Sequence, residues 1–358
     1  MNKQEKIKID KENEINQIFC SNPNFKFKQI IIDNNNSSGY NDIFEVYKSM
    51  KDAEIYLASP NKKEYILDII IIKNCKLYKS LKGHIYYINI VKYFINRNNN
   101  YEYLISVDKS NLIIVWDIKS DYSNIFQIKG QTSRGFISSS LICFINSNNK
   151  VNSYIIFSYR SKQYTNVYSL DKKEKIEVIE NTNNYNTYYI LYWLNKKDNS
   201  NYIIELSDGN IYMYNILKKS LFYTLNLGEL SCSKNYCGII FTKNNIDYLI
   251  VCTSSGTINI WDLENNNIIH SLSLNKCYDK NKIYLSYILQ WSEKYIVVCE
   301  YYNKGLKILD IDKLKIITSI RGRHSGSIIC AKKFMHPIYG ESLLTSGEDN
   351  NIILWNIR

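Results

Sequence analysis

The feature that most limits how this chain can fold is an internal repeat that covers most of its 358 residues. Seven segments alternate apolar and polar residues in the same way: EYILDIII (64–71), NLIIVWDI (111–118), YTNVYSLD (164–171), NIYMYNIL (210–217), TINIWDLE (257–264), GLKILDID (305–312) and NIILWNIR (351–358). Their equivalent positions are Ile70, Trp116, Tyr168, Tyr214, Trp261, Leu309 and Trp355, at spacings of 46, 52, 46, 47, 48 and 46 residues. Such a period indicates a repeat architecture.

Each repeat contains three further segments with strand character. A segment such as YEYLISVD (101–108) precedes the aligned one, and a segment such as NIIHSLSL (267–274) follows it. Further upstream, a third segment ends in an aromatic residue: Tyr47, Phe94, Phe144, Trp193, Phe241, Trp291 or Phe334. The alternation and the abundance of Ile, Tyr and Val favour strands, and no long helix is indicated. Each repeat is therefore predicted to be a four-stranded antiparallel sheet.

Seven such sheets predict an all-β fold, a seven-bladed β-propeller. One four-stranded sheet cannot bury both of its faces, whereas a radial arrangement packs each sheet on its neighbours. The last repeat lacks a fourth strand, since the sequence ends with NIILWNIR. We predict that FKFKQIII (25–32) supplies this strand and closes the ring by pairing into the last blade. Residues 1–24 are then a polar, mobile lead-in, and 25–358 form a single propeller domain with 25–33 as the outer strand of the last blade.

Short motifs resemble those of the WD-repeat (WD40-type) β-propeller family, in divergent form. They are Gly83-His84, Trp116-Asp117, Trp261-Asp262 and the last repeat, HSGSIICAKKFMHPIYGESLLTSGEDNNIILWNI. In that family a His, a Ser or Thr, an Asp and the Trp form a structural hydrogen-bond set. By position, the resemblance implies the set His324, Thr345 (with Ser346 as an alternative), Asp349 and Trp355.

Two other repeats keep part of this pattern. The second keeps His84, Ser106 and Trp116, but Ser110 stands at the turn position where the family has Asp. The fifth keeps Trp261-Asp262, has Ser255 at the turn and lacks the His. The resemblance in periodicity therefore extends over most of the chain, while the motifs are recognisable in three repeats.

Cysteine usage and apolar runs predict a soluble protein of the cytoplasm, with the nucleus as the alternative. The nine cysteines form no C-x-x-C pair, which favours reduced thiols over disulfides or a zinc site. The N-terminus, MNKQEKIKIDKENEINQ, lacks the apolar core of a signal peptide. The longest aliphatic run, Ile69–Ile72, is too short to cross a bilayer. No cofactor, metal or membrane insertion is expected.

A search for catalytic groupings favours a protein that is not an enzyme. No G-x-S-x-G surrounds any serine, and neither a P-loop nor G-x-G-x-x-G is present. The four histidines are His84 and His324 at repeat positions, His270 on an expected outer strand, and His336 beside Pro337.

The resemblance instead implies a non-catalytic scaffold that presents propeller loops to protein partners in a complex. We name as the top face the turns between second and third strands together with the entries to the first strands. Tyr and Arg are the residue types that supply binding energy at protein interfaces. The candidate partner-binding residues on the top face are Tyr86, Tyr87, Arg134, Arg160, Tyr302, Lys304 and Arg323.

The alternative function is a nucleic-acid- or RNP-associated propeller that binds through a basic surface. The formal net charge is +11, and ten lysines fall on turns of the face opposite the top face. They are Lys73, Lys119, Lys172, Lys173, Lys196, Lys197, Lys218, Lys219, Lys243 and Lys313. This Lys-rich face lacks arginines and interleaved aromatics, so nucleic acid is the less favoured partner. The heavy use of Lys, Asn, Ile and Tyr also fits an AT-rich coding sequence.

Overall fold

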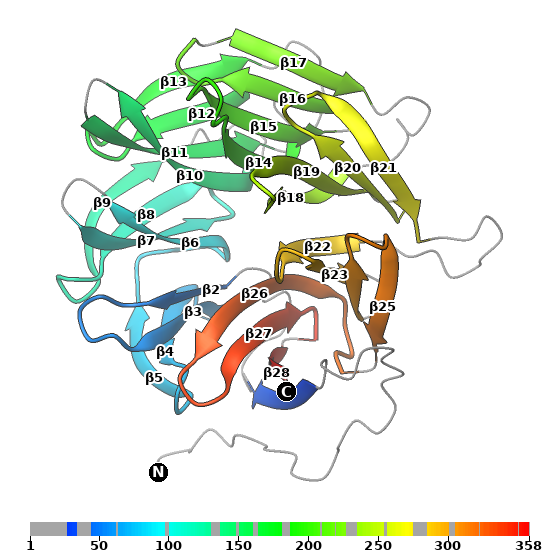
Figure 1. Cartoon of the computed structure of the whole chain (residues 1–358). Helices are drawn as coiled ribbons and strands as arrows, with labels where there is room; N and C mark the ends of the chain where they lie inside the picture. Colours follow the sequence, from blue (N-terminus) through cyan, green and yellow to red (C-terminus); the bar gives the residue numbers. More distant parts are fainter. Residues whose placement is uncertain are drawn as a thin grey trace.

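The chain forms seven four-stranded antiparallel sheets set in a ring, as the computed structural model shows (Figure 1). The residues that it describes are 27–33, 44–61, 64–96, 100–129, 137–147, 150–159, 164–180, 187–207, 210–218, 220–226, 235–253, 256–274, 285–300, 305–321, 323–349 and 351–357. Within these ranges there is no helix. The predicted all-β, seven-bladed propeller is therefore confirmed. The proposed lead-in, residues 1–24, lies outside the described residues.

Six blades consist of four consecutive strands that follow one another from the innermost position to the outermost. The first three are β2 (Glu45–Lys48), β3 (Ile55–Asn61), β4 (Ile66–Ile71) and β5 (Lys76–Leu81); β6 (Ile88–Asn96), β7 (Tyr101–Asp108), β8 (Leu112–Asp117) and β9 (Ser123–Lys129); β10 (Ile137–Ser147), β11 (Lys150–Tyr159), β12 (Tyr164–Ser169) and β13 (Glu174–Glu180). The next three are β14 (Thr187–Leu194), β15 (Asn201–Ser207), β16 (Asn210–Asn215) and β17 (Ser220–Asn226); β18 (Asn235–Lys243), β19 (Ile246–Thr253), β20 (Thr257–Asp262) and β21 (Asn267–Ser273); β22 (Leu285–Gln290), β23 (Tyr295–Glu300), β24 (Leu306–Asp310) and β25 (Lys315–Ile320).

The seventh blade combines strands from both ends of the described chain. Its strands are β26 (Ile328–His336), β27 (Gly340–Gly347), β28 (Asn351–Ile357) and, outermost, β1 (Phe27–Asp33). β1 runs antiparallel to β28, with Phe27 opposite Ile357 and Asp33 opposite Asn351. The innermost strands of neighbouring blades touch all round the ring, including β26 with β2. That the pairing of β1 holds the ring closed stays a prediction.

The seven residues aligned in the sequence stand at equivalent places in the third strands of their blades. In the first six blades the aligned residue directly follows a shift of register between the third and fourth strands, as Trp116 does in β8. Trp355 faces Leu343 across the sheet as Trp116 faces Leu104. All seven side chains are buried. The recurrence of this bulge shows that the sequence period is a period of the fold.

One part of the alignment is wrong. Phe94 of the first strand in its blade faces Tyr103, and in the third blade Cys143 faces Tyr154, which is the residue equivalent to Tyr103. Phe144 therefore lies one position beyond the aromatic site at which it was aligned. The third repeat is also the one with the longest spacing, 52 residues, and a shift within it is hard to see in sequence.

The core consists of apolar layers between neighbouring blades. In the described part of the chain each of the seven interfaces has its own cluster of buried residues. Trp193, for example, stacks on Tyr202 and belongs to the layer that contains Trp261 of the next blade. Its indole N–H also donates to the carboxylate of Asp247 in that next blade, at 3.1 Å. The first-strand aromatics Trp193 and Trp291 are thus core residues, both buried, and not surface anchors.

Asparagine-rich turns allow the blades to be compact. β18 and β19 are joined by Asn244 and Asn245 alone, and both have positive φ angles, 50° and 63°. A two-residue hairpin turn with positive φ at both positions matches the twist of the strands, and Asn tolerates this conformation well. Part of the high Asn content therefore has a structural reason.

Candidate functional site

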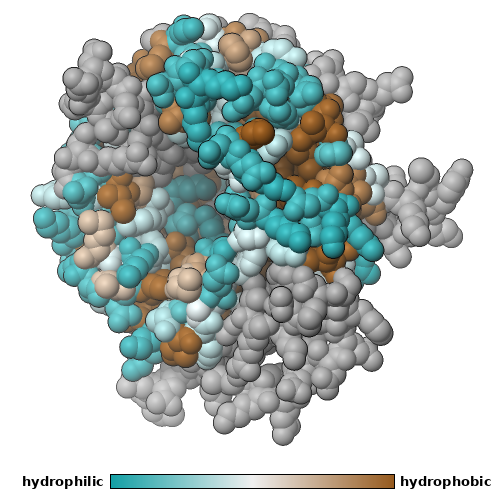
Figure 2. All heavy atoms as spheres, viewed as in Figure 1, coloured by the Kyte–Doolittle hydropathy of each residue, from teal (hydrophilic) through white to brown (hydrophobic). Residues whose placement is uncertain are grey.

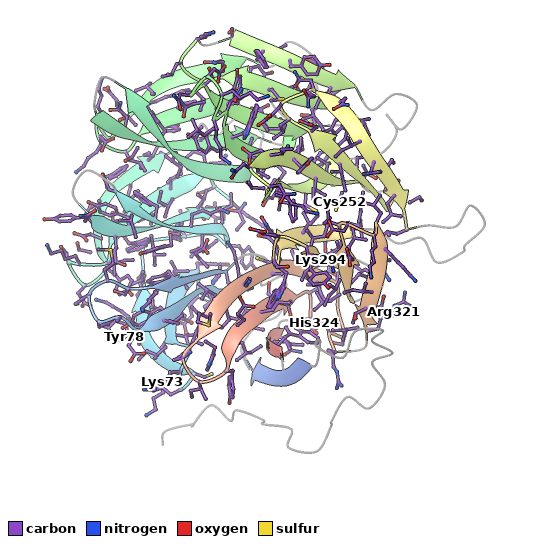
Figure 3. The ribbon with its side chains drawn as sticks, viewed as in Figure 1. Lys73, Tyr78, Cys252, Lys294, Arg321 and His324 are labelled. Carbon is purple, nitrogen blue, oxygen red and sulfur yellow. The ribbon has the colours of Figure 1, made fainter. Side chains whose placement is uncertain are left out.

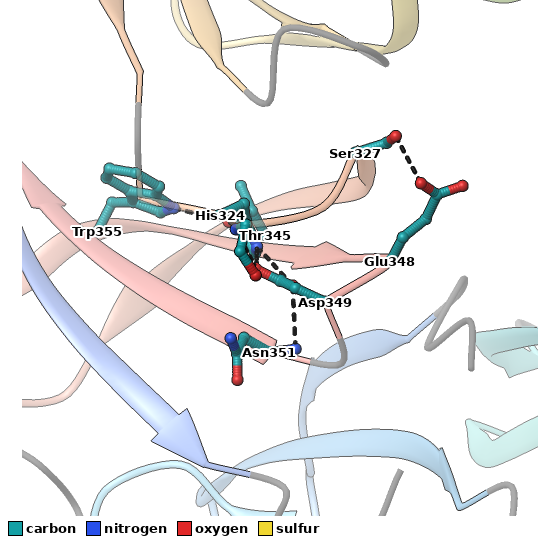
Figure 4. Close-up of polar contacts among 8 residues, drawn as sticks. His324, Ser327, Thr345, Glu348, Asp349, Asn351 and Trp355 are labelled. Atoms are coloured by element: carbon teal, nitrogen blue, oxygen red, sulfur yellow. Dashed lines mark hydrogen bonds and ion pairs between the residues drawn. The ribbon is translucent and has the colours of Figure 1, made fainter. Parts of the chain in front are cut away.

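The predicted hydrogen-bond set of the last blade comes together in space (Figure 4). The indole N–H of Trp355 donates to Thr345 Oγ1 at 2.7 Å, and this oxygen lies 2.8 Å from His324 Nε2. His324 Nδ1 lies 3.0 Å from each carboxylate oxygen of Asp349. We assign the hydrogens so that the Thr345 hydroxyl donates to Nε2 and the N–H at Nδ1 donates to Asp349, which gives every polar atom of the row a partner. The hydroxyl is that of Thr345, not that of Ser346.

Asp349 connects three segments of this blade. Besides His324, its carboxylate accepts hydrogen bonds from the backbone N–H groups of Ser325 at 2.7 Å and Asn351 at 3.2 Å. Burial raises the pKa of Asp349, but the hydrogen bond from His324 and those from the two backbone N–H groups lower it more, to about 2. The ionised carboxylate therefore stabilises the entry to β26 and the turn before β28 together.

The second blade contains an equivalent set with a different carboxylate. Trp116 Nε1 donates to Ser106 Oγ at 2.8 Å, and this oxygen lies 2.7 Å from His84 Nε2. His84 Nδ1 is bonded to Asp108 Oδ2 at 2.9 Å. Ser110, at the turn position of the family Asp, does not contact the imidazole in this set; its N–H and hydroxyl donate to Asp108 at 2.8 and 2.6 Å. The sequence pattern missed Asp108 because it lies two residues before the expected position.

The last blade shows why the carboxylate has two alternative positions. Asp108 ends β7, and Gly347 holds the same place at the end of β27. A Cβ atom added at Gly347 would lie 2.6 Å from His324 Nδ1 and 2.7 Å from Asp349 Oδ1. The space beside the imidazole can thus hold a carboxylate from the strand end or from the turn, but not both.

Three other blades fill the equivalent region differently. In the fifth, Val251 stands at the place of Ser106, so no hydroxyl faces the buried Trp261. In the fourth, Glu205 stands there, and its carboxylate accepts a hydrogen bond from Thr165 of the preceding blade at 2.5 Å. In the sixth, Glu300 holds the place of Asp108, and its carboxylate lies 2.9 Å from the buried ammonium group of Lys307. Arg321 lies 3.8 Å from the same carboxylate.

Among the described residues of the top face, the most exposed apolar segment is the entry to the second blade. Ile85, Tyr86 and Tyr87 are 69%, 51% and 38% exposed. The buried His84 anchors the start of this segment through its two hydrogen bonds, and the carbonyl of Tyr87 accepts a hydrogen bond from Lys109 N at 2.9 Å. We call Ile85–Tyr87 the exposed entry segment.

Neighbouring groups extend this surface. The ring of Tyr65, from the turn between β3 and β4, meets the ring of Tyr87 edge-on with 5.0 Å between centroids. The ammonium group of Lys109 lies 5.3 Å from the centroid of the Tyr87 ring, within cation–π range. The structure thus brings the predicted Tyr86 and Tyr87 together with Tyr65 and Lys109, which sequence reasoning did not find.

The other predicted top-face residues are separate from this surface or outside the described residues. Arg323 is partly buried and directly precedes His324 at the entry to the last blade. Arg134, Arg160, Tyr302 and Lys304 lie outside the described residues.

The Lys-rich face is partly neutralised by carboxylates. Ammonium groups of Lys172, Lys196, Lys197 and Lys243 pair with Glu174, Asp247, Glu264 and Asp312. Lys119 lies over the ring of Tyr101, 4.5 Å from its centroid. Figure 3 places Lys73 at the outer edge of the first blade, near Tyr78, rather than beside the centre of the ring. Lys219 lies outside the described residues, and the described part of this face is a mixed surface and not a continuous basic patch.

The remaining two histidines, His270 and His336, differ in their surroundings. His270 is exposed on β21. His336 is buried, and its Nδ1 accepts hydrogen bonds from the backbone N–H groups of Ile338 and Tyr339 at 3.0 and 3.2 Å. Among the described residues, no three His, Cys, Asp or Glu side chains gather where they could hold a metal ion. Nor does any described segment form a helix with the length and apolarity to cross a membrane.

No protein-family model matches the chain, and no curated protein matches it in sequence. The β-propeller fold therefore rests on the described strands and their pairing, and the WD-repeat family remains a resemblance carried by the motifs.

Proposed function

We propose that the protein is a non-catalytic interaction scaffold, a divergent WD-repeat propeller that holds protein partners on its top face. The observation that carries this proposal is the exposed entry segment, Ile85–Tyr87, in which three large apolar side chains face solvent in succession. Exposed apolar surface of this kind is typical of protein–protein contacts, and Tyr supplies both apolar area and a hydrogen-bonding hydroxyl. The expected compartment is the cytosol or nucleus.

The fold itself does not require these apolar side chains. The last blade builds the corresponding entry from Ser325, Gly326 and Ser327, which follow His324 as Ile85–Tyr87 follow His84. Its backbone makes the same hydrogen bond, from Glu348 N to the carbonyl of Ser327 at 2.9 Å. Since small polar residues form the same turn in the last blade, folding alone does not explain the large apolar side chains of Ile85–Tyr87.

The exposed entry segment is also held rigid before it meets a partner. It lies between the buried His84 and the backbone hydrogen bond of Tyr87. A loop that is already ordered loses less conformational entropy on binding, which favours affinity. The hydrogen-bond set below it therefore supports binding indirectly.

The nucleic-acid alternative has weaker support. On the Lys-rich face, carboxylates of Glu or Asp pair with Lys172, Lys196, Lys197 and Lys243. Phosphate groups of a nucleic acid would compete with these ion pairs. A protein partner on the top face accounts for more of the described surface.

The test replaces the exposed entry segment with the sequence of the last blade. Tagged full-length protein and the variant Ile85→Ser/Tyr86→Gly/Tyr87→Ser are used for pull-downs from the native cell at low salt, at high salt and after nuclease treatment. A matched control, Met335→Ser/Ile338→Ser, removes two exposed apolar side chains, 59% and 61% exposed, near the turn between β26 and β27.

We expect a small set of proteins that survives high salt and nuclease with the wild type and the control, and is lost with the entry variant. Retention of the same proteins by the entry variant would show that another surface binds them. Loss of all bound proteins at high salt or with nuclease would favour the Lys-rich face and nucleic acid.

A further inference from the structure

The inner wall of the ring carries an uneven distribution of charge. The register of the sheets identifies one equivalent position in the first strand of each blade. In the six blades whose side chains are described there, its residues are Glu45, Lys92, Leu191, Ile239, Leu289 and Lys332. The three charged residues lie on β26, β2 and β6, which are consecutive in the ring. The other three described residues are apolar, so the charge gathers in one sector of the central channel.

Within this sector one carboxylate faces two ammonium groups. Both carboxylate oxygens of Glu45 lie 3.1 Å from Lys332 Nζ. Burial lowers the pKa of Lys332, but the charge of Glu45 and of its other neighbours raises it more, so the net shift is upward. Lys332 is therefore charged and matched by Glu45.

Lys92 is the unmatched member of the group. Among the described residues, no carboxylate lies within ion-pair distance of its ammonium group, and Glu45 is already engaged by Lys332. Burial and the charge of Lys332 lower the pKa of Lys92, and the attraction of Glu45 only partly offsets this. The sector thus holds one positive charge in excess when both lysines are protonated, in surroundings where an unpaired charge is unfavourable.

Two tyrosines stand on first strands of other blades. Tyr189 on β14 and Tyr287 on β22 lie close enough for their hydroxyls to shift each other's pKa, although their blades are not neighbours. Burial raises the pKa of Tyr189 to about 12, although the charge of Lys332 acts in the opposite direction, so the hydroxyl keeps its proton. A protonated Tyr hydroxyl is a hydrogen-bond donor.

Solvent reaches this sector. Lys92 is partly exposed even though protein surrounds it, and the side chain of Lys332 is 22% exposed. Figure 2 shows that the visible face of the molecule is hollowed near the middle of the ring and that the surface seen in the hollow is hydrophilic.

We propose that this sector of the channel binds a small oxyanion, a carboxylate or a phosphate, between the ammonium groups of Lys92 and Lys332. The ligand supplies the countercharge that Lys92 lacks. Charge-assisted hydrogen bonds of this kind are stronger than neutral ones, and a partly dehydrated channel strengthens them further. This site is separate from the exposed entry segment and does not depend on the proposed scaffold function.

The test measures binding of two probes, inorganic phosphate and succinate, to the full chain by isothermal titration calorimetry in buffer free of other oxyanions. Lys92→Met removes the unmatched charge and keeps the length of the side chain. Lys73→Met makes the same change at the exposed outer edge of the first blade. Glu45→Gln removes the carboxylate that competes for Lys332. Thermal unfolding of each variant establishes that it is folded.

We expect Lys92→Met to weaken binding of the preferred probe roughly 10- to 100-fold, the effect of losing one charge-assisted hydrogen bond. Glu45→Gln is expected to strengthen binding, and Lys73→Met to leave it unchanged. Tighter binding of phosphate or of succinate identifies which oxyanion fits. Equal affinity of wild type and Lys92→Met for both probes, or no binding to the wild type, would overturn the proposal.

Discussion

Asp108 reaches the imidazole of His84 from the last position of β7, with 2.9 Å between Oδ2 and Nδ1. In the last blade the same bond to His324 comes from Asp349, which lies in the turn two positions later. The two blades therefore provide the same hydrogen bond from two backbone positions. At the strand end, where the second blade has Asp108, the last blade has Gly347. In the turn, where the last blade has Asp349, the second blade has Ser110.

This relationship predicts that the two arrangements can be exchanged. Gly347→Asp alone should destabilise the protein by about 1–3 kcal/mol, because the new Cβ crowds His324 and Asp349. Asp349→Ser alone should cost a similar about 1–3 kcal/mol, because the N–H of His324 loses its buried acceptor. The double variant recreates the arrangement of the second blade and should recover most of the loss. Urea unfolding of all four proteins gives the coupling free energy, which we expect to be favourable by at least about 1 kcal/mol.

The reciprocal exchange in the second blade is the control. Asp108→Gly with Ser110→Asp moves the carboxylate from the strand end to the turn, as in the last blade. Additive losses in both blades would show that the two carboxylate positions are not interchangeable.

The ionised state of Asp349 predicts a dependence of stability on pH. Its pKa is lowered from 3.8 to about 2 in the folded protein, so the stabilisation is fully present above about pH 4 and is lost as the pH falls toward 2. Its side chain is almost fully buried, so the shift corresponds to a free energy on the order of 2 kcal/mol. Unfolding free energies of wild type and Asp349→Asn, measured by tryptophan fluorescence between pH 5 and pH 2.5, should converge as the pH falls. Parallel curves would contradict this role.

The periodic part of the fold was accessible from sequence, because the alternation of apolar and polar residues and the aligned positions, such as Trp116 and Trp355, recur at each repeat. The role of Asp108 could not be predicted from sequence, because it lies two residues before the position at which the motif has its Asp. The grouping of the channel residues Glu45, Lys92 and Lys332 could not be predicted from sequence either. They are separated by up to 287 positions in the chain, and only the strand register places them at one level.

The sixth blade predicts a strong dependence on a buried ion pair. The side chains of Glu300 and Lys307 are 1% and 7% exposed. Lys307→Met should destabilise the protein by about 3–5 kcal/mol, because it removes the buried ammonium group and leaves the largely exposed Arg321, 3.8 Å away, as the remaining described ion-pair partner of Glu300. Glu300→Gln in addition should recover much of this loss, since no charge then remains buried. Chemical unfolding of the single and double variants is the measurement, and equal stabilities would show that solvent or Arg321 compensates for Lys307.

Ring closure by β1 gives the prediction with the largest expected effect. Deletion of residues 1–33 removes β1 and leaves the backbone of β28 without its outer neighbour, from Asn351 to Ile357. An uncovered strand edge presents unpaired N–H and C=O groups that pair readily with other chains. We expect the truncated protein to aggregate or to unfold at a clearly lower temperature, as measured by light scattering and thermal unfolding.

Deletion of residues 1–20 is the matched control, because it removes none of the residues paired with β28. This shorter deletion should leave both the melting temperature and the oligomeric state unchanged. A soluble 1–33 deletion with the stability of the full chain would show that the contact between β2 and β26, together with the apolar layer between the first and last blades, is enough to close the ring. The two deletions therefore separate closure by strand pairing from closure by side-chain packing.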